Sequence, residues 1–86
     1  MKPAEIGNGE RAKVRLAAAN APTMIVFEPI GWDISLEVGE EIFVDLPLSD
    51  LSSLEIVVWE TGLSVWLPYT GDQFVLDKDG REIEPL

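Results

Sequence analysis

Residues 54–68 read Leu-Glu-Ile-Val-Val-Trp-Glu-Thr-Gly-Leu-Ser-Val-Trp-Leu-Pro, two short runs of β-branched and aromatic residues around a Thr-Gly pair. Such runs favour strands, and the pair between them is typical of a hairpin turn. With residues 61–62 as the loop, side-chain alternation predicts one aliphatic face and one face of Val57, Trp59 and Trp66, the two indoles lying in diagonal reach. Both faces are apolar, so the hairpin is either covered on both sides or presents an aromatic surface to a partner.

Other segments alternate in the same way. Residues 32–38 place Trp, Ile, Leu and Val on one face, and residues 42–46 resume the pattern after a Gly-Glu turn, which predicts a second hairpin. Residues 13–17 alternate as well, although residues 10–20 also have a helix-favouring composition. The turn after them favours the strand and predicts an antiparallel pair with residues 24–27. An Asp-Gly pair at residues 79–80 predicts a last hairpin. About seven short strands predict an all-β fold, a small antiparallel sandwich or barrel of cupredoxin-like or immunoglobulin-like type.

Length and composition predict one domain. The chain has 86 residues, 47% of them hydrophobic, which favours a globular fold over disorder. Residues 1–12 lack periodicity in most of their length and are expected to form a flexible N-terminal tail before a domain of residues 13–86. The chain has no cysteine, which fits a reducing cytoplasm, and its longest apolar runs are too short to cross a bilayer. We therefore expect a cytoplasmic protein that binds no membrane.

The charge is strongly negative and unevenly distributed. The net charge is −10, and residues 24–86 carry fourteen carboxylates against Lys78 and Arg81. Nucleic acids and anionic lipids are bound through Lys and Arg, so neither is an expected partner. The acidity serves solubility or recognition of a basic partner. Acidic side chains along the strands also blunt the sheet edges, which predicts a monomer or a weak homodimer.

The residues that most catalytic and metal sites require are absent. The chain has no His and no Cys, so it lacks the usual general base near neutral pH, the thiol nucleophile and the common zinc and copper ligands. The acidic stretch at residues 77–80 fails the spacing of a calcium loop and is interpreted as a turn. We therefore predict that the protein is not an enzyme and uses no cofactor and no metal.

One order of turns and strands is similar to that of a known protein group. Residues 28–31 read Glu-Pro-Ile-Gly, an alternating strand containing Leu36 follows, Gly39 and Glu40 form the next turn, and Leu-Ser-Val-Trp comes at residues 63–66. This order resembles a group of small uncharacterised bacterial proteins. The resemblance implies a compact all-β domain in which residues 13–17 form a strand. It transfers no catalytic or binding residue.

Three functions are compatible with this sequence. The first is a non-enzymatic interaction or accessory module that binds a protein partner through the aromatic hairpin face or a sheet edge. The second is an acidic inhibitor or immunity-type protein that blocks a basic site, with candidate contacts Glu37, Glu40, Glu41, Asp45 and Glu55. The third is a carbohydrate-binding module that uses its indoles. The predicted partner-binding residues are Val57, Trp59, Trp66, Glu55, Glu40 and Glu41.

Overall fold

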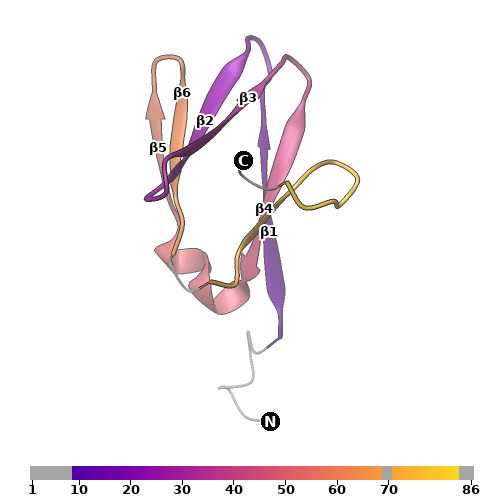
Figure 1. Ribbon diagram of the computed structural model, residues 1–86, viewed down its shortest axis with the longest axis vertical. Coiled ribbons are helices and arrows are strands. Elements are labelled where there is room, and N and C mark those ends of the chain that lie inside the picture. The colour runs from indigo at the N-terminus through magenta and orange to yellow at the C-terminus, as the bar shows by residue number, and fades with distance from the viewer. Residues whose placement is uncertain (1–8, 69–70, 84–86) are drawn as a thin grey trace.

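The protein is a sandwich of two β-sheets. The computed structural model describes residues 9–68 and 71–83, and its seven strands lie in two layers with a short 3-10 helix at one end (Figure 1). This confirms the predicted all-β fold. The elements are β1 (Arg11–Ala17), β2 (Thr23–Glu28), β3 (Trp32–Leu36), β4 (Glu41–Pro47), η2 (Leu48–Ser53), β5 (Glu55–Trp59), β6 (Gly62–Trp66) and β7 (Phe74–Leu76).

The two sheets differ in width and in strand direction. The three-stranded sheet has the order β1-β4-β7 and is antiparallel throughout. The four-stranded sheet has the order β3-β2-β6-β5, and its central pair, β2 and β6, is parallel. A three-stranded layer is too narrow to cover a four-stranded one completely, which leaves part of the wider sheet uncovered.

Two predicted hairpins are wrong because the chain changes sheet at their turns. β1 pairs with β4 rather than with β2, and β3 pairs with β2 rather than with β4. The two connections lie side by side, since the Gly39 N–H donates to the Ala18 carbonyl (2.8 Å) and the Ala18 N–H donates to the Glu40 carbonyl (3.1 Å). These bonds satisfy backbone groups that a hairpin ladder would otherwise pair.

The core lies between the sheets and is filled by alternate residues of the strands. β4 contributes three consecutive inward positions, Ile42, Val44 and Leu46, as its alternation predicts. Phe27 of β2 is fully buried and stacks on Trp32 of β3, with 5.3 Å between ring centroids. The buried apolar residues are Leu16, Ala18, Ile25, Phe27, Leu36, Ile42, Val44, Leu46, Val65 and Val75.

The β5–β6 hairpin has a different loop from the predicted one. Residues 60–61 form the loop, Trp59 pairs with Gly62, and Glu55 pairs with Trp66. Gly62 is the first residue of β6 and lies directly beside Met24 of β2. A Cβ at this position would lie 2.0 Å from the carbonyl oxygen of Met24, so only glycine permits this close approach of the two strands. The register differs from the predicted one by two residues, which preserves the faces but removes the diagonal contact between the indoles.

The N-terminal boundary also differs slightly from the prediction. β1 begins at Arg11, so the last two residues of the predicted tail belong to a strand, and residues 1–8 lie outside the described residues. The strand predicted for residues 13–17 is confirmed as part of β1. In the described ranges, no helix is long and apolar enough to span a membrane.

Candidate functional site

β5 is an edge strand of the four-stranded sheet, and its sequence protects little of it. All five of its residues are exposed, and four of them are apolar. The strand pairs with β6 on one side only, so its backbone groups on the other side have no strand partner within the described chain. Edge strands are usually protected by charged residues, Pro or a bulge, and the only such feature within β5 is Glu55, at the first position of the strand. This edge is therefore open to strand addition.

The other edges of the sandwich are better protected. β1 carries Arg11, Lys13 and Arg15 at alternate positions, and β3 carries Asp33. β7 is only three residues long, and the Ile83 N–H donates to its Val75 carbonyl (2.7 Å). Of the two five-residue edge strands that the structure describes, β3 and β5, only β5 has three apolar residues at its centre.

The outer face of the four-stranded sheet continues this surface. Val57 and Trp59 of β5 share it with Trp66 of β6, and the exposed fractions of the two indoles are 40% and 42%. The indole N–H of Trp59 donates to the Ser64 hydroxyl (3.1 Å), which satisfies its polar group locally. Met24 of β2 extends the apolar area. The structure thus brings the three predicted aromatic-face residues onto one exposed surface.

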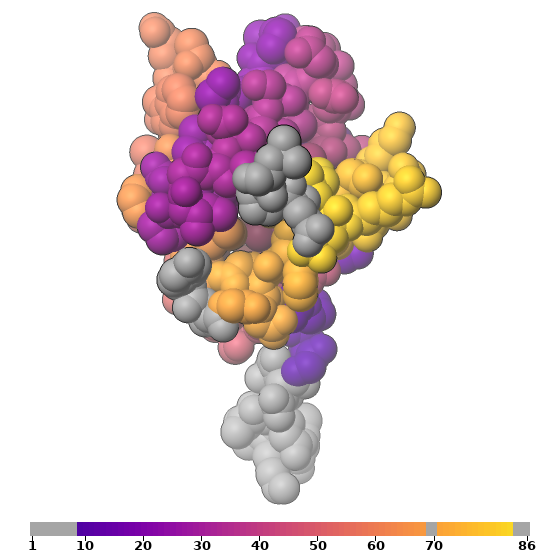
Figure 2. All heavy atoms as spheres, viewed as in Figure 1, coloured from indigo at the N-terminus to yellow at the C-terminus, as the bar shows by residue number. Residues whose placement is uncertain are grey.

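The inner face of β5 is also open, because the three-stranded sheet does not reach it. Val58 is 76% exposed and Ile56 is 40% exposed, although both point to the same side as the buried Val65. A cleft of about 390 Å³ lies beside Val58, and its lining also includes Ala17 of β1 and Pro22. In Figure 2 a notch separates the tip of the β5–β6 hairpin, at upper left, from the indigo and magenta turns at upper right.

The charge on the four-stranded sheet is entirely negative. Its strands contain Glu28, Asp33 and Glu55 and no Lys or Arg. The basic residues that the structure describes belong to β1 and to the turn after β7. Glu55 pairs with Trp66 across one ladder and Glu28 pairs with Trp66 across the next, so the indole lies between two carboxylates in one row. Directly paired residues point to the same face, which makes this row acidic and aromatic.

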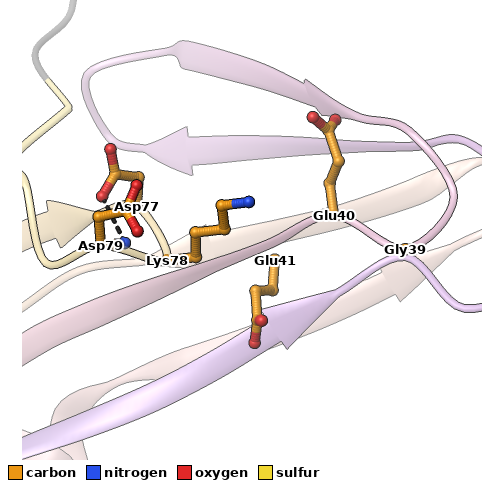
Figure 3. A pocket seen from close by; sticks show the side chains of 6 residues that line it. All are labelled: Gly39, Glu40, Glu41, Asp77, Lys78 and Asp79. Atoms are coloured by element: carbon orange, nitrogen blue, oxygen red, sulfur yellow. Dashed lines mark hydrogen bonds between the residues drawn. The ribbon is translucent and has the colours of Figure 1, made fainter.

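Glu40 and Glu41, predicted as partner contacts, lie apart from this surface. They stand at the start of β4 in the three-stranded sheet, beside a pocket of about 240 Å³ that Lys78 also lines (Figure 3). Glu41 forms an ion pair with Arg15, and a Glu40 carboxylate oxygen accepts the Glu37 N–H (2.7 Å). Their side chains point away from each other (Figure 3). The structure therefore separates the six predicted residues into a group of four and a group of two.

The turn after β7 also lines this pocket, and its acidic residues have structural partners. The Asp77 carboxylate accepts the backbone N–H groups of Arg81 (2.9 Å) and Asp79 (2.8 Å; Figure 3). These hydrogen bonds lower the pKa of Asp77, and the bond from Arg81 has the largest effect. They outweigh desolvation, which acts in the opposite direction. This geometry is that of an Asx turn. Within residues 9–68 and 71–83, no group of acidic residues is arranged to hold a metal ion.

Four members of the exposed surface were not among the predicted site residues: Met24, Glu28, Ile56 and Val58. Ile56 and Val58 were assigned to the aliphatic face of the hairpin, and Glu28 was considered only in a turn or as a solvated carboxylate near Asp33. The alternation of Met24, Val26 and Glu28 along one side of β2 is the signal that places Glu28 beside the aromatic residues. The exposure of Ile56 and Val58 has no such signal, because it depends on the width of the opposite sheet.

Comparisons with protein-family models, with curated proteins and with solved structures find no significant match.

Proposed function

We propose that this domain is a non-enzymatic interaction module that binds an extended segment of a protein partner as an added strand on β5. The observation that carries the proposal is the mostly apolar edge formed by residues 55–59, all five of which are exposed. An extended peptide would pair with the open backbone groups, and its alternate side chains would cover the two apolar faces of the strand. The cysteine-free sequence favours the cytoplasm as the place of action.

The exposed aromatic residues support a protein as the partner. Trp and Tyr are enriched in the energetically dominant parts of protein interfaces, and Trp59 and Trp66 lie on the face that continues from the open edge. Carbohydrate binding also uses exposed indoles, but it has no use for open backbone groups at a strand edge. Strand addition uses both features together.

The contacts of the carboxylates favour this function over a broad acidic inhibitor surface. Of the candidate contacts for that role, Asp45 binds Arg11 and Glu41 binds Arg15 within the chain. Glu40 accepts a backbone N–H from Glu37. These carboxylates would have to give up intramolecular partners before they could bind a basic active site. Only Glu55 of that group lies on the open edge.

Selection from a displayed library of random heptapeptides tests the proposal. Two matched variants, Val58→Lys on β5 and Val38→Lys in the turn after β3, replace exposed valines by the same charged residue. We expect peptides selected on the unchanged domain to lose binding to Val58→Lys and to retain it on Val38→Lys, because a lysine on the edge opposes strand addition.

The backbone contribution can be tested on the selected peptides themselves. Methylation of alternate peptide nitrogens removes the donors that a ladder needs, so binding should be lost in one of the two methylation registers and kept in the other. Binding that survives methylation in both registers would contradict strand addition. Binding that both valine variants retain would place the site elsewhere.

A further inference from the structure

The row Glu28–Trp66–Glu55 gives the open surface a chemical preference. The three residues lie side by side on β2, β6 and β5 and point to the outer face. Neighbouring strands are about 4.8 Å apart, which places the two glutamate Cα atoms roughly 10 Å from each other with the indole between them. Trp66 is 42% exposed, so this row is accessible to a ligand.

The two carboxylates of this row have no cationic partner in the described part of the chain. Arg11 pairs with Asp45 and Asp72, and Arg15 pairs with Glu41, all outside the four-stranded sheet. The indole face attracts cations through its quadrupole, and the flanking carboxylates act in the same direction. A cationic side chain laid across Trp66 would therefore be favoured by three groups at once.

We propose that the partner segment is basic and that it places an arginine or lysine opposite Glu55, with the cationic group over Trp66 between Glu55 and Glu28. This inference rests on the proposed strand addition at β5. In an antiparallel arrangement, the partner residues opposite Ile56 to Trp59 would be apolar or β-branched, and the cationic residue would follow them toward the carboxyl end.

Charge complementarity favours this occupant over a second copy of the chain. The chain carries a net charge of −10, and the four-stranded sheet has only acidic charges. Two copies joined at β5 would bring these carboxylates together across one continuous sheet, which is unfavourable. A basic segment would neutralise them.

Two synthetic peptides test the proposal by isothermal titration calorimetry. Both contain Thr-Leu-Val-Thr-Val-Xaa-Thr between Ser-Gly ends with blocked termini, where Xaa is arginine in one and citrulline, its neutral isostere, in the other. We expect the arginine peptide to bind at least about tenfold more tightly at low salt, because cation–π and carboxylate contacts are lost with the charge. Hydrogen exchange of residues 55–59 should slow when it binds.

A matched pair of double variants locates the effect. Glu28→Gln with Glu55→Gln should reduce the preference for arginine to about threefold, since the flanking charges are removed and only the cation–π contact with Trp66 remains. Asp79→Asn with Glu82→Gln removes the same charge from the turn after β7 and should leave the preference intact. Equal effects of the two pairs would overturn the site and indicate a response to net charge alone.

The remaining outcomes separate this inference from the proposed function. If both peptides bind equally and slow exchange at residues 55–59, strand addition stands and the basic partner is overturned. If neither peptide binds or slows exchange there, both proposals fall. If sedimentation shows a dimer that Val58→Lys converts to a monomer, the occupant is a second copy, and the basic segment is again overturned.

Discussion

The indole N–H of Trp59 donates a 3.1 Å hydrogen bond to the hydroxyl of Ser64 across the β5–β6 hairpin. The two residues are diagonal neighbours on the outer face, since Trp59 pairs with Gly62 and Ser64 pairs with Val57. This bond, formed within one hairpin, helps to orient an exposed aromatic side chain at the open edge. It therefore contributes both to the hairpin and to the shape of the proposed binding surface.

Removal of the Ser64 hydroxyl should weaken the domain slightly. We expect Ser64→Ala to lower the free energy of unfolding in urea by about 0.5–1 kcal/mol, the usual net value of one hydrogen bond. Ser35→Ala on the outer face of β3 is the matched control and should leave the free energy of unfolding nearly unchanged. Equal values for the two variants would show that the Trp59 bond contributes nothing.

A side chain at position 62 should disrupt the four-stranded sheet. Gly62→Ala places a Cβ within 2.0 Å of a backbone oxygen of β2, so β2 and β6 must separate or the chain must shift. We expect a loss of more than about 2 kcal/mol of stability. Gly80→Ala, at a glycine with φ of 82° and no atom near the added Cβ, should cost only about 1–2 kcal/mol. Thermal unfolding of both variants gives the comparison, and a smaller loss for Gly62→Ala would contradict this packing.

Arg11 should stabilise the three-stranded sheet through several weak contacts. Its guanidinium pairs with Asp45 (2.7 Å) and Asp72 (3.0 Å) and lies 5.4 Å from the centre of the Phe74 ring. We expect Arg11→Ala to lower stability measurably, and by less at high salt because exposed ion pairs are screened. Lys13→Ala on the same strand should change stability by less than about 0.5 kcal/mol. Equilibrium unfolding at two salt concentrations measures these losses of stability. Equal losses for the two variants at both concentrations would contradict this role of Arg11.

The turn after β7 should respond to acid through Asp77. The pKa of this carboxyl is lowered in the folded chain because the Arg81 and Asp79 N–H groups bind its charged form. Its contribution to stability is therefore present above the ordinary value of 3.8 and is lost as the pH falls through the lower folded pKa. We expect Asp77→Ala to lower Tm at pH 7. The difference in Tm between this variant and the unchanged protein should become smaller as the pH is lowered. A Tm difference that grows with acidification would contradict this sign.

Side-chain alternation predicted where the strands lie but not how they pair. Ile42, Val44 and Leu46 are buried as expected, because a period of two fixes which side of a strand faces the core. The Gly39-Glu40 turn is equally compatible with a hairpin and with a crossing to the opposite sheet, since both send alternate residues into the same core. The pairing depends on long-range packing that the local pattern does not encode.

The site shows the same division between local and long-range information. The shared face of Val57, Trp59 and Trp66 was predicted correctly, since a register error of two residues preserves the face. The exposure of β5 follows instead from the narrower opposite sheet. Gly62 was misassigned to the loop because glycine serves both turns and close backbone approach, and only the position of Met24 distinguishes them.

The parallel pairing of β2 with β6 also governs when this chain can fold during its synthesis. Residues 24–28 have no neighbour on one side until residues 62–66 have left the ribosome, and β4 lacks its second neighbour until β7 has emerged. Each sheet is therefore completed only by a late segment of the polypeptide. Nascent chains that end before Trp66 should therefore remain open to proteases, and protection should appear in one late step.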